Sequence, residues 1–320
     1  MRFGRRGLAA LLAAPGLARA QAAYPARSVT VLVGYPPGGA NDIIARSIGA
    51  KLGAAFGQPF VVENRAGAGG TLVGSVAARA AADGYTLFMC GGAHALAPAL
   101  YRSLPYDIVG DFRAVSQAAA SGYVLVVHPS VPARSVAAFI ALAKAQPGRL
   151  NFSSSGVGAP LHLAGVLFQQ MTGTRMEHVP YQGDADAITA IISGTVECGF
   201  MSIAASKAHI DGGRLVALAV TDDVESPALP GVPTLSASGL PGYRVTTWWG
   251  LLAPKHTPED VVQKLSRAAQ AAAKSDEVVQ RFLGLGLRPV GSDADAFQAF
   301  IKAEVESFST LARAAGVQPQ

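Results

Sequence analysis

The chain has 320 residues, and half of them are hydrophobic, which is enough apolar material for two folded domains rather than one. Its formal net charge of +5 falls to about +1 once the four arginines of the first 20 residues are set aside. The remainder shows no run of basic residues and no Lys/Arg cluster interleaved with aromatic residues, so we exclude nucleic acid as a partner.

The N-terminal segment has the pattern of an export signal. A basic region with three arginines precedes residues 7–17, which are apolar but too short to span a bilayer, and a small-x-small cleavage pattern ends at Ala20. Cleavage after Ala20 and cleavage after Ala22 both fit this pattern, so we predict a signal peptide over residues 1–22. Two adjacent arginines leave the Sec and twin-arginine routes open. We expect an exported, periplasmic protein with no later membrane-spanning segment.

Apolar, β-branched runs alternate with helical patterns along the rest of the chain. We predict strands at residues 29–33, 60–63, 85–89, 124–128, 151–153, 177–179, 196–200 and 215–221. We predict helices at residues 43–56, 72–81, 93–101, 135–145, 160–171, 185–193, 261–273, 276–283 and 293–315. The alternation is typical of an α/β architecture with parallel strands. Near the end the pattern becomes helical, with Thr257 as a helix N-cap before Pro258.

The most informative segment follows the first predicted strand. The apolar run over residues 29–33 ends in a Pro-Pro-Gly-Gly turn at 36–39, and a helix begins at once with Asn41 or Asp42 at its cap. A strand that turns on glycines into a helix leaves backbone N–H groups without partners, at the positive end of the helix dipole. We therefore predict that the chain holds an anion near residues 35–42.

A second turn has the same design and lies in the other half of the chain. Residues 153–155 are serines that offer hydroxyl groups, Ser153 and Ser155 among them, while Gly156 and Gly158 allow backbone amides to approach a ligand. Two such turns in separate halves predict a ligand held between two lobes. His94, which follows a further Gly-Gly turn, and Asp42, at the start of the first helix, are added to the candidate ligand-binding residues.

Signatures of nucleotide binding and of catalysis are absent from the sequence. Gly69 and Gly74 have the spacing of a phosphate-binding loop, but Ser75 stands where the lysine is required. There is no G-x-S-x-G motif, and Ser155 and His162 lack an acid that would orient the histidine. The six histidines are scattered without metal-ligand spacing. We expect no enzyme activity, no metal and no cofactor, with an exported hydrolase as the less favoured alternative.

Several further residues have two possible roles. Asp184 begins a predicted helix and is either a helix-terminal acid or a ligand contact, and it is the better ligand candidate compared with Asp186. Cys90 and Cys198 look like the ends of buried strands, where free thiols are common, although export also permits a disulfide. The adjacent tryptophans at 248–249 are expected to anchor a loop to the core or to line the pocket.

Several short motifs, in their order along the chain, carry a family resemblance. They are YPPGGAND at 35–42, VENRAGAGG at 62–70, DGYTL at 83–87, LPYD at 104–107, SGVG at 155–158, HLAG at 162–165, VPY at 179–181, GLPG at 239–242 and WGL at 249–251. Together they resemble the substrate-binding proteins of tripartite tricarboxylate transporters, the Bug family.

The resemblance implies a type II periplasmic-binding fold with two α/β lobes. Each lobe would be a mixed, mostly parallel sheet flanked by helices, with the ligand cleft between the lobes. On this basis we expect residues 23–123 with 250–320 to form lobe 1 and residues 124–249 to form lobe 2, with hinge strands near 120–125 and 245–250.

The resemblance also implies a ligand class and a binding site. The ligand would be a small carboxylate: a dicarboxylate or tricarboxylate, an amino acid or an aromatic acid. Its carboxylate would be held by backbone groups and ordered waters from the two turns. The binding residues carried over are Tyr35, Gly38, Gly39 and Ala40 in lobe 1, and Ser155, Gly156, Gly158 and His162 in lobe 2, with Asp184 at a position that varies with the ligand.

The expected partners follow from the same resemblance. The protein would be a monomer that delivers its ligand to membrane transporter subunits. The alternative is a sensor role, in which the same lobes present the ligand to a membrane signalling kinase.

Overall fold

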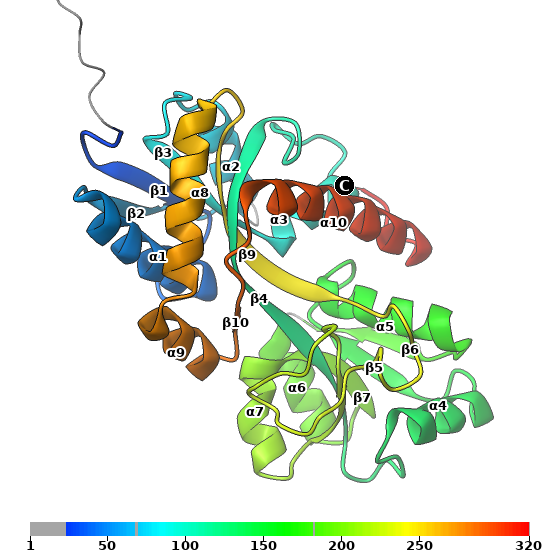
Figure 1. Cartoon of the computed structure of the whole chain (residues 1–320). Coiled ribbons are helices and arrows are strands. Elements are labelled where there is room, and N and C mark those ends of the chain that lie inside the picture. Colours follow the sequence, from blue (N-terminus) through cyan, green and yellow to red (C-terminus); the bar gives the residue numbers. More distant parts are fainter. Residues whose placement is uncertain (1–23, 68–69, 182, 320) are drawn as a thin grey trace, which may run out of the picture.

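The computed structural model describes residues 24–67, 70–181 and 183–319, so the predicted export signal lies outside the described residues. Two lobes are joined by long strands that run from one to the other (Figure 1). The strands are β1 (Val29–Val33), β2 (Phe60–Asn64), β3 (Thr86–Gly91), β4 (Phe112–Val127), β5 (Asn151–Ser154), β6 (Glu177–Pro180), β7 (Cys198–Ser202), β8 (Val216–Val220), β9 (Thr246–Pro254) and β10 (Arg288–Pro289). The helices are α1 (Ala40–Phe56), α2 (Thr71–Ala78), α3 (Gly92–Leu100), α4 (Val136–Ala145), α5 (Pro160–Thr172), α6 (Asp184–Ile192), α7 (Ile203–Asp211), α8 (Glu259–Ala273), α9 (Asp276–Gly284) and α10 (Ala294–Ala314).

Each lobe contains its own set of paired strands. In the first lobe the order is β2-β1-β3-β9-β4, with β10 also paired to β4, and β1 is parallel to both of its neighbours. In the second lobe the order is β6-β5-β7-β4, with β8 also paired to β4, and β5 is parallel to both of its neighbours. The parallel sets are the predicted strand–helix–strand units, whereas β9 and β4 pair antiparallel to the strands beside them.

Strand β4 belongs to both sheets. Its residues 112–122 pair with β9 in the first sheet, and its residues 123–127 pair with β7 and β8 in the second. The strand has 16 residues, far above the usual length of about 5–6. The sequence predicted only its last part, because the first part is rich in Ala, Ser, Gln and Gly rather than in β-branched residues.

Helices cover both faces of each sheet, so each lobe has three layers. Two hydrophobic clusters lie on the two faces of β1. The cluster with α1, α8 and α9 contains Val29, Val31 and Val33, and the cluster with α2, α3 and α10 contains Leu32. This alternation is the period of two that places successive side chains on opposite faces of a strand. The second sheet is covered by α4 and α5 on one face and by α6 and α7 on the other.

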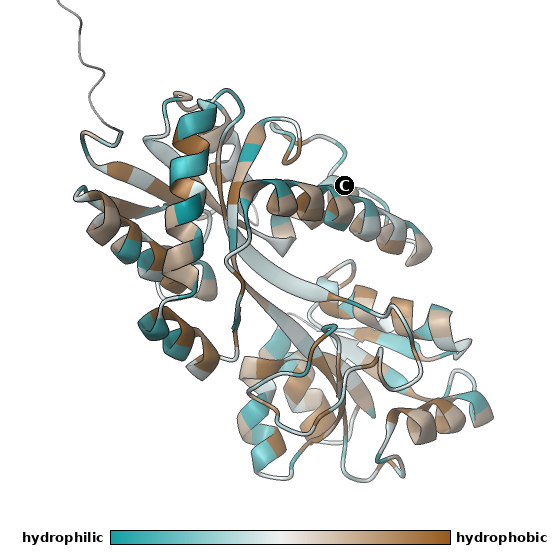
Figure 2. Ribbon diagram, in the orientation of Figure 1, coloured by the Kyte–Doolittle hydropathy of each residue, from teal (hydrophilic) through white to brown (hydrophobic). Residues whose placement is uncertain are grey.

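Surface helices show the corresponding amphipathic pattern. Val261, Leu265 and Ala269 recur every four residues along α8 and are buried against the first sheet. The outward side of this helix is hydrophilic in Figure 2. None of the helices within the described ranges combines the length and the apolar character that a membrane crossing requires.

Two predicted helix caps are wrong. The N-cap of α1 is Gly39, and both Asn41 and Asp42 lie inside the first turn. The N-cap of α8 is Pro258 rather than Thr257, whose hydroxyl donates to the carbonyl oxygen of Pro254 at 2.8 Å. Helix α7 was not predicted, because its nine residues follow β7 directly, with no glycine or proline between the two elements.

Candidate ligand cleft

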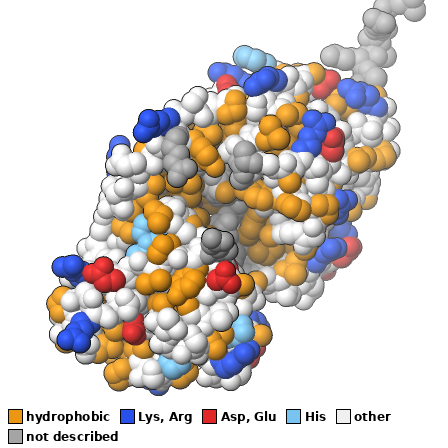
Figure 3. All heavy atoms as spheres, turned by 180° about the vertical axis from the view of Figure 1, so that it is seen from behind, with side chains coloured by type: hydrophobic (Ala, Val, Ile, Leu, Met, Phe, Trp, Pro, Cys, Tyr) orange, Lys and Arg blue, Asp and Glu red, His pale blue; other side chains and the backbone are white. Residues whose placement is uncertain are grey.

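A cavity of 290 Å³ lies between the two lobes. The first lobe contributes the first turn of α1, with Ala40 and Ile43, and part of β9 with Trp249. The second lobe contributes the start of α7, and residues 121–123 of β4 line the cavity where the strand passes from one sheet to the other. The space-filling view shows a hollow between the lobes (Figure 3). The volume lies just below the range of about 300–1,000 Å³ typical of small-molecule sites.

The N-terminus of α1 opens on this cavity. Gly39 is the N-cap, with extended backbone at φ −79°, and it has no side chain that could accept the first N–H groups of the helix. Gly38 precedes it at φ +87°, a left-handed conformation that glycine adopts without strain. Ala40, the first residue of the helix, lines the cavity. The predicted anion site therefore faces the space between the lobes.

Asp42 is directed into the protein rather than into the cavity. Its carboxylate accepts hydrogen bonds from the Gly38 N–H at 3.0 Å and from Asn64 Nδ2 at 3.0 Å, and it pairs with Arg46 at 2.9 Å. Asn64 Nδ2 also donates to the carbonyl oxygen of Tyr35 at 3.0 Å. Burial raises the pKa of Asp42, but the hydrogen bonds from Arg46, Gly38 and Asn64 outweigh it and hold the pKa below its ordinary value. The residue fixes the shape of the first turn.

His94 is a buried support behind the first turn. Its Nδ1 accepts the Gly91 N–H at 3.0 Å, and its Nε2 lies 3.3 Å from the carbonyl oxygen of Gly70. Burial lowers its pKa to about 4, so the ring is neutral and donates from Nε2 while accepting at Nδ1. The ring of Tyr35 packs edge-on against it. A Cβ on Gly70 would lie 2.8 Å from His94 Nε2, which requires glycine there.

The serines of the second turn have different roles. Ser153 is fully buried and donates to the carbonyl oxygen of Ala187 at 3.1 Å, so its hydroxyl is used within the lobe. Ser154 donates to the carbonyl oxygen of Gly156 at 3.0 Å and accepts the Gly156 N–H at 3.2 Å. Gly156 has φ +134°, a conformation that L side chains rarely adopt.

Two stacked histidines brace the same turn. His162 Nδ1 accepts the Gly158 N–H at 3.0 Å, and the rings of His162 and His178 stack with centroids 3.9 Å apart. His178 Nε2 lies 2.7 Å from Ser154 Oγ. Burial lowers the pKa of both imidazoles, that of His178 to about 4 with a further contribution from His162. The Nδ1 atom of His162 is thus used to hold the second turn.

Asp184 connects the second turn with the start of α7. It is the first residue of α6, and its carboxylate accepts hydrogen bonds from the side chains of Ser202 and Ser155. Burial raises the pKa of Asp184, and the two hydrogen bonds offset only part of that effect. Ser202 lines the cavity and also caps α7 by accepting the Ala205 N–H at 3.4 Å. The structure thus brings Asp184 and Ser155 together beside the cavity wall.

Sequence reasoning missed the residues that the two long strands contribute. Tyr123 of β4 and Thr247 of β9 both line the cavity, and their side chains are hydrogen-bonded to each other. Burial raises the pKa of Tyr123. Along β9, Trp249 lines the cavity, while Trp248 points into the core and donates from Nε1 to Glu304 at 3.0 Å. Trp249 thus lines the pocket and Trp248 anchors the strand to the core, because successive side chains of a strand point to opposite faces of the sheet.

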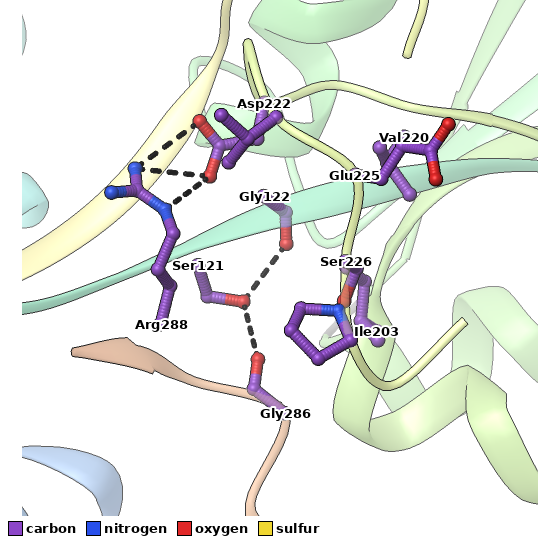
Figure 4. A pocket seen from close by; sticks show the side chains of 11 residues that line it. Ser121, Gly122, Ile203, Val220, Asp222, Glu225, Ser226, Gly286 and Arg288 are labelled. Carbon is purple, nitrogen blue, oxygen red and sulfur yellow. Dashed lines mark hydrogen bonds and ion pairs between the residues drawn. The ribbon is translucent and has the colours of Figure 1, made fainter. Parts of the chain in front are cut away.

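An ion pair lies beside the cavity where the lobes join. Arg288 of β10 reaches Asp222, which follows β8 in the other sheet, at 3.3 Å (Figure 4). Ser121, which lines the cavity, donates to the carbonyl oxygens of Gly122 at 3.0 Å and Gly286 at 3.3 Å. Burial raises the pKa of Asp222, and the charge of Arg288 partly offsets this. These contacts connect β4, the loop before β10 and the second lobe.

The two cysteines are free and buried in separate sheets. Cys90 donates to the carbonyl oxygen of Gly250 at 3.3 Å, and Cys198 donates to that of Asn151 at 3.4 Å. The disulfide that export would permit is therefore not formed. Within the described part of the chain, His, Cys, Asp and Glu do not gather in groups of three or more that could hold a metal.

Comparison with known proteins gives consistent matches. A family model described as "Tripartite tricarboxylate transporter family receptor" matches residues 44–317. Protein BugT of Bordetella pertussis is 35% identical over 297 residues, which cover 92% of this chain and 91% of BugT. The structure of R. palustris Rpa4515 with adipate is 33% identical, with a TM-score of 0.74, and the match covers 93% of this chain and 100% of that one. MatC (Rpa3494) from Rhodopseudomonas palustris with bound malate is 30% identical, with a TM-score of 0.69 over 90% and 99% of the two chains. The fold is that of two-lobe periplasmic solute-binding proteins, and the chain belongs to the tripartite tricarboxylate transporter receptor family, whose members are binding proteins rather than enzymes.

Proposed function

We propose that this protein is an extracytoplasmic receptor that reversibly captures a small carboxylate for a membrane transporter of the tripartite tricarboxylate type. The observation that carries the proposal is the uncapped N-terminus of α1, which opens on a cavity between two lobes. Backbone N–H groups at a helix N-terminus bind anions without a charged partner, which suits reversible capture. The relatives with adipate and with malate support a carboxylate as the anion.

Capture would proceed by closure of the two lobes on the ligand. The N–H groups at the start of α1 would bind a carboxylate from one side, whereas the Gly38 N–H is already donated to Asp42. The second turn at 155–158 would bind it from the other side through groups other than the N–H groups of Gly156 and Gly158, which already donate to Ser154 and His162. A ligand favours the closed state only to the extent that it binds that state better, and a carboxylate that bridges both turns supplies this difference.

The lobes proposed to move are residues 23–123 with 250–320 and residues 124–249. The change of pairing partner between Gly122 and Tyr123 in β4 supports a hinge near 120–125, and β9 would supply the second hinge near 245–250. We further propose that residues 1–22 direct the chain to the periplasm and are then removed.

Gly39 provides a clean test, because a side chain there meets nothing closer than the Pro36 carbonyl oxygen at 3.9 Å and the backbone is unstrained. Gly39→Leu would cover the helix N-terminus without disturbing the fold. We expect isothermal titration with adipate, malate and aromatic acids to show at least tenfold weaker binding, with an unchanged midpoint of thermal unfolding. Ala54→Leu, on the exposed end of α1, is the matched control and should bind normally.

A second substitution tests the other lobe. Gly156→Leu should also weaken binding, at some cost in stability because its φ of +134° disfavours a side chain. Full affinity in both the Gly39 and the Gly156 variants would contradict the two-turn site. Failure of the wild-type protein to bind any carboxylate in the panel would contradict the proposed function itself.

A further inference from the structure

The end of α10 turns the chain back in a defined direction. Gly316 follows the helix at φ +69°, a left-handed conformation that favours glycine. Its N–H donates to the carbonyl oxygen of Arg313 at 3.0 Å, and the Val317 N–H donates to that of Ala312, also at 3.0 Å. These two hydrogen bonds form a Schellman motif, which closes the C-terminus of a helix. Because both bonds fix the backbone, Val317 leaves the helix at a defined position.

The residues after Val317 are held by the end of α3. Arg102, two residues beyond that helix, donates from Nε to the carbonyl oxygen of Pro319 at 2.9 Å. Residues 316–319, which we call the α10 tail, are thus fixed at one end by the Schellman motif and at the other by Arg102. Both fixing elements belong to the first lobe, because α3 and α10 contribute to the same hydrophobic cluster on the first sheet.

The α10 tail contacts the second turn, which belongs to the other lobe. A Cβ on Gly158 would lie 3.0 Å from Leu100 Cδ2 and 3.4 Å from Val317 Cγ1, so two side chains of the first lobe close over this glycine. Gly158 is buried, and its N–H donates to His162 Nδ1 at 3.0 Å. The glycine is therefore held from within its own lobe by His162 and from the first lobe by Leu100 and Val317.

The helix that follows the second turn packs against the first lobe in the same region. Leu163 of α5 is fully buried in a cluster with Leu96 of α3 and with Phe308 and Leu311 of α10. Helix α10 extends from the first lobe to α5 and contacts it (Figure 1). The contact between Gly158 and the α10 tail therefore continues an apolar packing surface between the two lobes.

The outer side of this contact is open. Val157 is 66% exposed, and a cavity of 340 Å³ is lined by Val157, Leu100, Tyr101 and Val317. Removal of methyl groups from Val317 would enlarge this space beside the second turn and take away dispersion contacts that nothing replaces. Val317 is itself only half-buried, so its truncation should cost the fold little stability.

Resting on the proposed function, in which the second turn binds the ligand, we propose that Val317 and Leu100 are positioning residues for that turn. They act through Gly158, because their side chains hold the second turn at the distance from α1 at which both turns reach one ligand. A turn that is already in place costs less to order when the ligand binds, so the contact raises affinity. Loosening the turn should mainly speed dissociation, which is where most changes in affinity arise.

The variant Val317→Ala tests the assignment. The ligand would be the tightest binder to the wild-type protein among adipate, malate and aromatic acids. We expect isothermal titration to show about fivefold weaker binding, and stopped-flow mixing to show a matching rise in the dissociation rate. The midpoint of thermal unfolding without ligand should stay within about 2 °C of wild type. Val317→Ile keeps the contact and should restore affinity to within about twofold of wild type.

A matched control and a second variant separate positioning from general stability. Val305→Ala removes the same atoms from a half-buried valine of α10 and should bind normally. Arg102→Met frees the other end of the α10 tail and should weaken binding as Val317→Ala does. Hydrogen exchange in the ligand-free protein should be faster over residues 155–158 in both of these tail variants, and unchanged in Val305→Ala.

The proposal requires both the loss of affinity and the faster exchange. Wild-type affinity in a folded Val317→Ala protein, or unchanged exchange over residues 155–158, would overturn the positioning role while leaving the two-turn site intact. Equal weakening by Val305→Ala would also overturn it, because the effect would then come from α10 as a whole. Failure of the wild-type protein to bind any acid of the panel would instead overturn the proposed function.

Discussion

Asp42→Asn isolates the contribution of one buried carboxylate to the shape of the first turn. The side chain of Asp42 is 5% exposed and accepts from Gly38, Asn64 and Arg46. Asparagine has the same size but one acceptor oxygen, and its amide N–H₂ would face groups that also donate. Hydrogen bonds to a charged group contribute about 1.5–3 kcal/mol each, and the pair with Arg46 is discounted because that side chain is half exposed.

The expected loss is therefore about 2–3 kcal/mol in the free energy of unfolding, which corresponds to a midpoint roughly 5–10 °C lower in thermal unfolding followed by circular dichroism. Ligand affinity should fall about tenfold, because the Gly38 N–H loses its hydrogen bond to the carboxylate and the turn is no longer preorganised for the ligand. Asp211→Asn is the matched control, since it removes an exposed pair with Lys207 at the same helical spacing. Such a pair contributes only a few tenths of a kcal/mol.

The pH dependence gives a second readout of the same residue. The pKa of Asp42 in the folded protein lies below its ordinary value of 3.8, so its stabilising contribution is present above pH 3.8 and is lost as the pH falls through the folded-state pKa. The difference between wild type and Asp42→Asn should therefore shrink on acidification. Equal midpoints for the two proteins near pH 7, or a difference no larger than that of Asp211→Asn, would show that the Asp42 carboxylate does not stabilise the first turn.

Three further results are expected. As the pH falls from 6.5 to about 4, the free energy of unfolding should decrease by roughly 3 kcal/mol, because the buried His94 must be neutral in the folded protein. Denaturant titration of His94→Asn should show a smaller decrease over the same pH range. A double-mutant cycle of Asp222→Asn and Arg288→Gln should give a coupling energy of about 1–2 kcal/mol for the partly buried pair, and a value near zero would show that it does not connect the lobes. Both Cys90 and Cys198 should resist a thiol reagent in the native protein and react fully in denaturant, whereas fewer than two reactive thiols would indicate a disulfide.

The α/β framework could be predicted because its strands are short β-branched runs bounded by glycine turns. Val29–Val33 and the first turn illustrate this, since both the strand and the helix after it are encoded within a few residues. The first part of β4 could not be predicted in this way. Its residues form a strand because β9, more than 100 positions later in the sequence, pairs with them, and such tertiary pairing overrides weak local preference.

The site could be predicted in part for the same reason. The two turns could be predicted because their glycines are visible in the sequence. The direction of the neighbouring side chains could not, because it depends on partners that are distant in the sequence. Asp42 is turned inward by Asn64, and Ser153 is held by the backbone of Ala187. Tyr123 and Thr247 meet only because β4 and β9 cross the junction of the lobes together, and neither residue lies in a recognisable motif.

A crystal structure with a bound ligand would show directly whether the two turns hold a carboxylate between the lobes. The ligand for crystallisation would be the tightest binder found by titration of the carboxylate panel. We expect its carboxylate between the first turn at Gly38–Ala40 and the second turn at Ser155–Gly158, with the body of the ligand against Trp249. A carboxylate bound away from both turns, or a ligand held by one lobe alone, would show that the two turns do not form the binding site.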